Sequence, residues 1–370
     1  MTMGNFPSAL ASGFVLGDTN TPGEEEGHSQ VAEMKYEPSL LDVIVVKTMM
    51  KKAMHLPPEM IDQIANQAEY WPHTSTEVSY GINPVSGVLA VRGGHGRQEN
   101  QFLLRTPPIG FPKWPRDVQL PPNFTQLPPT PRPVETQFSL NYYQRLIGSP
   151  EPMLAHPCRK IVFTIRSKDQ GWVNHHTPEE GPYSGSWTWF EAGLEQWSKE
   201  EDTTHDEDSD NTDTDTEKIS DGSETGNTDN GKEPQLNSPQ HQDTELEDED
   251  EPHTLTVNNL GTVYPEVVRS PATDEFAFEH PLLPREDVKI QANLTAEKAM
   301  TEHRVVWSSN DDMEPGCVEL EAIGRGKDTG TGRFVRCLQL GDIVTVWAKA
   351  RFLAWTNNIE SVKVDIYWAV

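Results

Sequence analysis

The stretches Asp342-Ile-Val-Thr-Val-Trp-Ala-Lys-Ala-Arg-Phe352 and Val362-Lys-Val-Asp-Ile-Tyr-Trp-Ala-Val370 decide the fold class of this chain. In both, apolar and polar residues alternate with a period of two, which places the apolar side chains on one face of a β-strand. The apolar set is Val344, Val346, Ala348, Ala350, Phe352, Val362, Val364, Ile366 and Trp368. The connection between the runs is polar and short enough to join antiparallel neighbours. We therefore expect two adjacent strands, each with one dry face.

Similar strand patterns occur earlier in the chain. They cover Lys160-Ile-Val-Phe-Thr-Ile-Arg166, Gly185-Ser-Trp-Thr-Trp-Phe190 and Arg304-Val-Val-Trp307. Several short strands with long, varied loops and almost no helix between them favour an antiparallel arrangement. The sequence predicts a mainly β fold, an antiparallel β-sandwich of jelly-roll-like form, built from residues 136–199 and 252–370.

An acidic insertion interrupts this sandwich at residues 200–251. It contains 21 Asp or Glu residues against two lysines, and so contributes 19 of the 28 net negative charges of the chain. A segment of this composition cannot bury enough apolar surface to fold, so we expect it to be disordered. Residues 1–38 are rich in Gly, Ser, Thr, Glu and Pro, and we expect a disordered leader there as well.

Residues 39–72 predict a helical hairpin. Ser39-Leu-Leu-Asp42 has the spacing of a capping box at the start of the first helix. Pro57 and Pro58 precede a second helix, where a proline in the first turn is tolerated. The apolar stripe of the second helix is Met60, Ile61, Ile64, Ala65, Ala68 and Trp71. Residues 73–135 are expected to be an extended, Pro-rich connection, within which residues 81–105 could contribute a hairpin or the first strands of the sandwich.

Composition excludes several classes of protein. Three cysteines without CxxC spacing argue against a disulfide framework and a structural zinc site. With no signal peptide pattern, we expect a cytoplasmic or nuclear protein, or one found in both compartments. No stretch is long and apolar enough for a membrane span, and no basic stripe would attract a phosphate backbone. We therefore expect protein partners, and neither nucleic acid nor membrane.

Tryptophans beside the predicted strands are the candidate contacts to a ligand or partner. The full candidate set is Trp172, Asn174, Trp187, Trp189, Trp355 and Asn357. Aromatic rings in sandwich loops can stack on sugars or peptides, with nearby polar groups to orient them. The alternative is structural: Trp187 and Trp189 alternate, so one ring could belong to the core. No residue pattern indicates catalysis, and we expect no enzyme activity, cofactor or metal.

Leu56-Pro-Pro-Glu-Met-Ile-Asp-Gln-Ile64 resembles the opening of F-box motifs. That resemblance implies docking on a Skp-type adaptor of cullin-based ubiquitin ligases, with Leu56, Ile61 and Ile64 as contacts. The alternative is that the same apolar residues pack against the sandwich of their own chain.

Longer segments resemble those of a group of filamentous-fungal proteins, some of which carry an F-box-like or ankyrin label. These segments are 159–172, 185–193 and 367–370. The resemblance supports the domain plan and implies no activity. Three functions remain: an intracellular protein-interaction module, with a substrate receptor or adaptor for ubiquitination as its specific form; a jelly roll that binds carbohydrate or a small ligand; and an unrecognised hydrolase.

Overall fold

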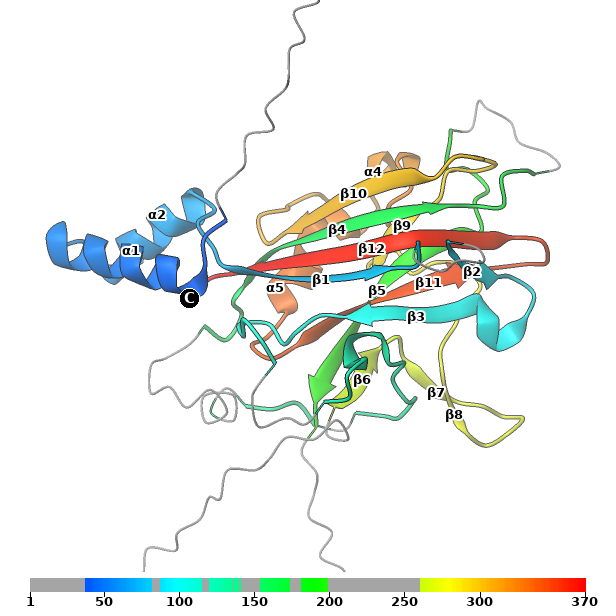
Figure 1. The fold of residues 1–370 in the computed structure, drawn as a ribbon, viewed down its shortest axis with the longest axis horizontal. Helices are drawn as coiled ribbons and strands as arrows, with labels where there is room; N and C mark the ends of the chain where they lie inside the picture. Colours follow the sequence, from blue (N-terminus) through cyan, green and yellow to red (C-terminus); the bar gives the residue numbers. More distant parts are fainter. Residues whose placement is uncertain are drawn as a thin grey trace, which may run out of the picture. The chain divides into compact units, whose positions relative to one another are not determined.

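The computed structural model describes residues 37–81, 87–114, 120–134, 136–139, 141, 154–173, 181–198 and 260–370. The expected leader, apart from residues 37 and 38, and the expected acidic insertion lie outside these ranges. Within them the chain is an antiparallel β-sandwich with two short helices at its N-terminal side (Figure 1). The mainly β fold predicted from the alternating runs is confirmed.

The first sheet, sheet A, has five strands. They are β1 (His73–Ser79), β2 (Leu89–Arg92), β4 (Cys158–Lys168), β10 (Thr301–Ser308) and β12 (Thr356–Trp368). The long strand β12 lies inside the sheet, with β4 on one side and both β1 and β2 on the other. The strand nearest the C-terminus of the chain therefore holds sheet A together.

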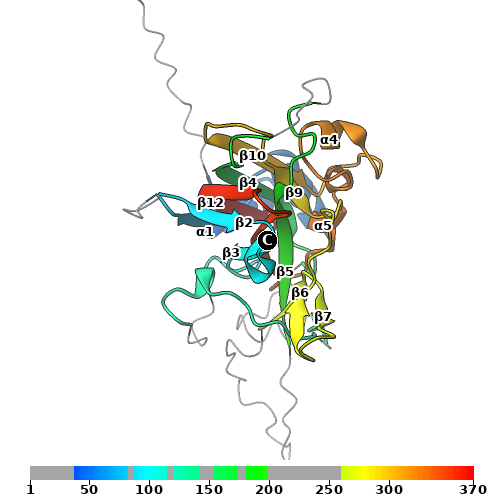
Figure 2. The same ribbon diagram turned by 90° about the vertical axis from the view of Figure 1, so that its right-hand side faces the viewer.

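The second sheet, sheet B, also has five strands and forms a separate layer (Figure 2). They are β3 (Asn100–Arg105), β5 (Thr188–Trp197), β6 (Leu260–Tyr264), β9 (Lys289–Ala292) and β11 (Ile343–Ala350). β11 lies between β3 and β5, and β5 pairs with β6 and β9 on its other side. All of these pairings are antiparallel.

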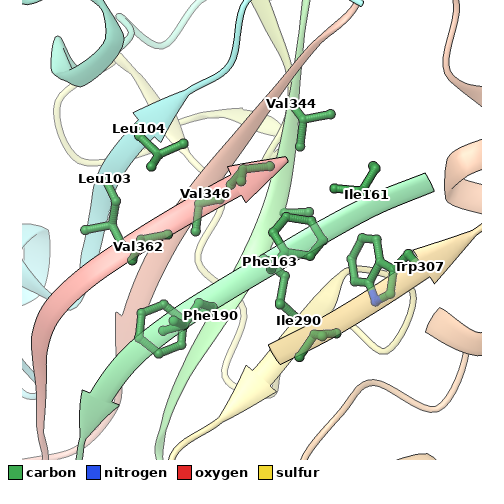
Figure 3. Close-up of a cluster of buried hydrophobic side chains, with 14 of the residues drawn as sticks. Leu103, Leu104, Ile161, Phe163, Phe190, Ile290, Trp307, Val344, Val346 and Val362 are labelled. Carbon is green, nitrogen blue, oxygen red and sulfur yellow. The ribbon is translucent and has the colours of Figure 1, made fainter. Parts of the chain in front are cut away.

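The main core lies between the two sheets. Figure 3 shows side chains from both layers meeting there, including Phe163 and Val362 of sheet A with Phe190 and Val346 of sheet B. Trp307 packs edge-on against Phe163, with ring centroids 4.9 Å apart. The apolar residues predicted from the period-two pattern are those that fill this core, apart from Phe352, which is exposed.

β11 and β12 are not adjacent strands, contrary to the prediction. β11 belongs to sheet B and β12 to sheet A, so the connection between them crosses from one layer to the other. Both strands still direct their apolar residues into the same core, one from each side. The alternation specifies which face of a strand is dry, but not on which side of the core the strand lies.

The segment expected to be a connection, residues 73–135, contributes three strands: β2 and β3 lie where a hairpin or the first strands of the sandwich were expected, and β1 was not predicted. β1 and β2 join sheet A, and β3 joins sheet B, so β2 and β3 do not form a hairpin with each other. The short 3₁₀ helix η1 (Gly96–Glu99) lies between them. Beyond β3, the Pro-rich part has no strand among its described residues, as expected for a segment that lacks so many backbone donors.

The outer face of sheet B is covered, which the strand pattern did not predict. Every residue of β11 is buried, including Thr345, Trp347 and Lys349 on the face away from the core. A second apolar cluster lies on this outer side. It contains Phe111, Phe124, Trp197, Leu260, Leu340 and Ile343. The Pro-rich segment, with its 3₁₀ helix η2 (Phe124–Gln126), thus supplies a cover for sheet B.

Smaller elements complete the fold. They are the strand pair β7 (Val267–Arg269) and β8 (Phe276–Phe278), the helices α4 (Val318–Ala322) and α5 (Arg333–Cys337), and the 3₁₀ helix η5 (Thr329–Thr331). Phe278 packs edge-on against Trp347, with centroids 4.9 Å apart, which places β8 over the outer face of sheet B.

The predicted helical hairpin is present as α1 (Leu40–Ala53) and α2 (Pro58–Gln67). The capping box is formed: the backbone N–H of Asp42 donates to Ser39 Oγ at 3.2 Å, and the N–H of Ser39 donates to Asp42 Oδ2 at 2.9 Å. Figure 1 shows the hairpin at the end of the sandwich where β1 begins and β12 ends.

Replacing residues 200–251 with a short Gly-Ser linker should leave the melting temperature within a few degrees of the full chain. Trp197 at the end of β5 lies directly opposite Leu260 at the start of β6, so the insertion connects two paired residues. Each halving of a flexible loop lowers its closure cost by only about 0.6 kcal/mol. Thermal unfolding followed by circular dichroism measures the effect, and a shortened chain without a cooperative transition would show that the insertion is structural.

Candidate functional site

Seven large apolar side chains of the helical hairpin are exposed. Their exposed fractions are Leu41 68 %, Ile44 48 %, Val45 46 %, Met49 62 %, Met54 64 %, Met60 49 % and Ile64 37 %. We call these seven residues the hairpin patch. A group of exposed apolar side chains on so short a segment is unusual for a free surface and is typical of an interaction site.

Four residues of the patch share one face of α1. Leu41, Ile44, Val45 and Met49 follow one another at helical intervals. Val43, on the opposite side of the helix, is buried. A helix with apolar residues on both sides is normally buried on all sides. The outer side of α1 is instead exposed, although it carries apolar residues.

Charged residues lie at the two ends of α1. Asp42 is in the first turn and Glu37 precedes the helix, whereas Lys51 and Lys52 are exposed in the last turn. Lys47, near the middle, is paired with Asp62 of α2 at 2.6 Å and so ties the two helices together. The outer side of α1 is therefore mainly apolar, with the exposed Thr48 and Lys52 among its apolar residues, an acidic start and a basic end.

The hairpin is anchored to the sandwich behind α2. Trp71 is buried, and its indole Nε1 donates to Asn66 Oδ1 at 2.9 Å. The ammonium of Lys160, on β4, lies 5.5 Å from the centre of the Trp71 ring and donates to Glu69 Oε2 at 2.5 Å. The same ammonium lies 4.7 Å from the ring centre of Tyr367 on β12. These contacts fix the hairpin while leaving its outer side open.

The three residues expected to contact an adaptor have different environments. Ile61 is 3 % exposed, Leu56 is half-buried and Ile64 is at the edge of the hairpin patch. Ile61 and Ala65 form the inner side of α2, so the stripe predicted from the sequence is divided between the inside and the outside. Ile61 has no surface to offer a partner in this structure.

A small cleft lies between the hairpin and the end of the sandwich. Its apolar lining includes Val43, Ala65 and Trp71, and its polar lining includes Lys47 and Arg159. These cations are already engaged: Lys47 bonds Asp62 and the carbonyl of Val370, and Arg159 Nη1 donates to the carbonyl of His156 at 3.0 Å. Burial lowers the pKa of Arg159 somewhat. The cleft shows no arrangement of an acid, a base and a nucleophile.

At the opposite end of the sandwich, the strand ends bring the predicted tryptophan loops together. Lys168 of β4 pairs with Asn358 of β12, and Thr188 of β5 pairs with Ala350 of β11, so the loops at 169–173, 185–187 and 351–355 share one end. Trp172 is 53 % exposed there. Trp187 is half-buried and packs edge-on against the exposed Phe352, with centroids 4.6 Å apart, and Trp355 is half-buried.

Two of the predicted contacts are buried and thus have no surface for a ligand. Trp189 is 1 % exposed, and its Nε1 donates to Glu191 Oε1 at 2.6 Å. Asn357 is fully buried; its Nδ2 donates to the carbonyl of Trp189 at 3.2 Å and its Oδ1 accepts from Asn293 at 2.9 Å. The structural alternative therefore holds for Trp189, and Asn357 joins the two sheets. Asn174 lies outside the described residues.

The outer face of sheet B carries two buried ion pairs that the sequence patterns did not reveal. Lys349 Nζ lies 2.7 Å from Glu191 Oε2, and Arg105 Nε lies 2.8 Å from Glu195 Oε2. Burial lowers the pKa of Lys349, with Glu191 acting in the opposite direction. His280, which lies beside Trp189, has its pKa lowered to about 3, chiefly by burial and then by Lys349 and Arg351. The four residues of these ion pairs are buried and offer no open reaction site.

Within the described residues, no three or more His, Cys, Asp or Glu side chains are grouped so that they could hold a metal ion. None of the described helices has the length and apolar content needed to cross a bilayer.

No match was found in comparisons with protein-family models, curated proteins and solved structures. Of the described segments, the helical hairpin carries the most exposed large apolar side chains. The sequence already contained a signal for it, because α1 has more apolar residues than one buried face of a helix can use.

Proposed function

We propose that this chain is an intracellular protein-interaction module and that the hairpin patch is its docking surface. The observation that carries the proposal is the exposed face of α1, on which Leu41, Ile44, Val45 and Met49 have no cover among the described residues. Apolar side chains at helical spacing are the anchors of helix-mediated recognition. The contacts of Trp71 and Lys160 hold the hairpin in place, so that a partner would meet a preformed surface.

A substrate receptor or adaptor for ubiquitination is the specific form of this function implied by the F-box resemblance. Burial of Ile61 removes one of the three expected adaptor contacts. The docking surface proposed here is displaced from that stripe, because it consists mainly of the outer face of α1. A Skp-type adaptor is therefore one partner to test, and the proposal does not depend on it.

Three substitutions of isoleucine by aspartate test the proposal. Ile44→Asp should leave the melting temperature nearly unchanged, because an exposed substitution usually costs no more than about 0.5 kcal/mol. Ile61→Asp should destabilise the fold by several kcal/mol, because it buries an unpaired charge. Ile323→Asp is the matched control, since Ile323 is 50 % exposed and lies after α4, far along the chain from the hairpin. Thermal unfolding gives the stabilities.

Affinity purification of the tagged full chain with mass spectrometry then reads out partner binding. Ile44→Asp should lose partners that the original chain and the Ile323→Asp variant both retain. An Ile44→Asp variant that folds normally and keeps every partner would contradict the proposal.

The tryptophan loops favour a second candidate function, the binding of a sugar or peptide. Trp172 presents more than half of its surface, and Gln170, whose Nε2 donates to the carbonyl of Trp172 at 2.6 Å, lies beside it. An exposed indole ring offers a large apolar face and an N–H donor, which suit stacking on a sugar or a peptide. A glycan array separates this candidate from the first.

A further inference from the structure

We infer that the occupant of the hairpin patch is a second copy of this chain, so that two α1 helices pack antiparallel about a two-fold axis. This inference rests on the proposed function, because it takes the hairpin patch to be a docking surface. It goes further by naming the partner and the geometry of the contact.

The patch has the self-complementarity that a two-fold interface requires. In such an interface the same surface is used by both copies, so each end of the patch meets the opposite end of its partner. The acidic end of α1 carries Glu37 and Asp42, and the basic end carries Lys51 and Lys52. Glu37 also lies 3.3 Å from His73 Nε2, and Asp42 accepts from Ser39 in the capping box, so contacts to the lysines of a second copy would add to these. An antiparallel arrangement brings the basic end of one copy to the acidic end of the other, twice.

The apolar centre of the patch fits the same arrangement. Leu41, Ile44, Val45 and Met49 lie between the two charged ends. In an antiparallel pair centred near Val45, Leu41 of one copy approaches Met49 of the other, and the residues near the axis meet their own counterparts. The four exposed side chains would thus be covered by an identical set, with their charged neighbours at the rim, as is usual for interfaces.

The charge of the hairpin disfavours an anionic lipid surface, whereas the separation of acidic and basic residues along α1 suits a second copy. Residues 37–69 contain five acidic side chains and only three lysines, and the whole chain has a net charge of −28. Interfacial helices that bind anionic membranes carry Lys and Arg along the polar face, which this hairpin does not. Binding to lipid vesicles is therefore a competing outcome that the experiment includes.

Sedimentation equilibrium of the full chain tests the inference. At concentrations from about 1 to 100 µM, the range in which weak homodimers form, the mass should rise towards twice the 41.6 kDa of one chain. Ile44→Asp should raise the dimer Kd at least about tenfold, since it places a charge in the apolar centre. Met49→Glu, a helix-compatible change at a residue that is 62 % exposed, should do the same. Ile323→Asp should keep the dimer.

The charged ends have their own test. Lys51→Glu combined with Lys52→Glu places like charges opposite each other at both rims and should weaken the dimer, whereas an apolar contact without a fixed direction would be insensitive to the change. Far-UV circular dichroism of each variant confirms that the helices remain.

Three results would overturn the inference. They are a chain that remains monomeric throughout the concentration range, a dimer unaffected by both Ile44→Asp and Met49→Glu, and a monomer that sediments with anionic vesicles and loses this property with Ile44→Asp. In the first case the proposed function survives if Ile44→Asp still loses a cellular partner. If no partner is lost either, the proposed function fails as well.

Discussion

Truncation of the chain after Ser361 should abolish cooperative folding, although it removes only the last nine residues of the sequence. The deleted part of β12 pairs with β4 on one side and with β1 on the other, so its loss opens the middle of sheet A. Val362, Val364, Ile366 and Trp368 are all fully buried in the main core. Burying each such side chain contributes very roughly 1.5 to 3 kcal/mol, and the four together match a typical net stability of about 5 to 15 kcal/mol.

Near-UV circular dichroism and thermal unfolding measure this effect. The truncated protein should be insoluble, or soluble with secondary structure and no cooperative transition. Two point variants of β12 give a matched comparison: Val364→Asp should destabilise the fold strongly, whereas Ser361→Asp, on the opposite face, half-buried and opposite Arg166 of β4, should have little effect. A soluble truncated chain that unfolds cooperatively would show that β12 is not part of the essential core.

The strands were predictable because burial on one face leaves a period-two signal in the sequence. Val362, Val364 and Ile366 show that signal, and all three reach the core. Their neighbours in the sheet were not predictable, because the pattern contains no information about pairing. The run at 343–350 was expected beside the run at 362–369, yet the two lie in opposite sheets. A short connection serves equally well to cross between layers.

The outer face of sheet B shows a different limit. Lys349 and Thr345 alternate with apolar residues and so read as solvent-facing, yet both are buried. The cover of this face comes from segments far away in the sequence, including residues 106–114 and 120–134, whose prolines predicted an extended chain but not where it would pack. Tertiary packing overrides the local pattern in such cases.

The candidate site was predicted in part. Helical periodicity and the capping box correctly gave the hairpin, and the F-box resemblance directed attention to α2. The exposed surface nevertheless lies mainly on α1, because Ile61 and Ala65 are buried on the inner side of α2. Which of two apolar faces a helix buries depends on the surface beside it in the fold. The sequence of the helix contains no information about that surface.

Arg105→Met should cost about 3 to 5 kcal/mol of folding free energy, because it leaves the buried carboxylate of Glu195 without its partner. The guanidinium makes two parallel bonds to Glu195, at 2.8 Å and 2.9 Å, and also donates to the carbonyl of Leu127 at 2.7 Å. It is sandwiched between Phe102 and Phe124, with ring centres 4.8 Å and 4.3 Å from its central carbon. Arg105 thus joins β3, β5 and the Pro-rich cover, and its loss affects all three.

The double variant Arg105→Met with Glu195→Gln separates the cost of an unpaired charge from the value of the pair itself. With both charges removed, a large part of the lost stability should return, since buried ion pairs contribute little beyond satisfying each other. Chemical denaturation of the original chain, both single variants and the double variant gives the coupling free energy between the two residues. If the double variant recovers most of the lost stability, the outer face of sheet B is stabilised mainly by apolar packing around an ion pair whose charges neutralise each other. A double variant no more stable than Arg105→Met would show instead that the bonds from Arg105 to the Pro-rich segment, and not the charge of Glu195, account for the loss.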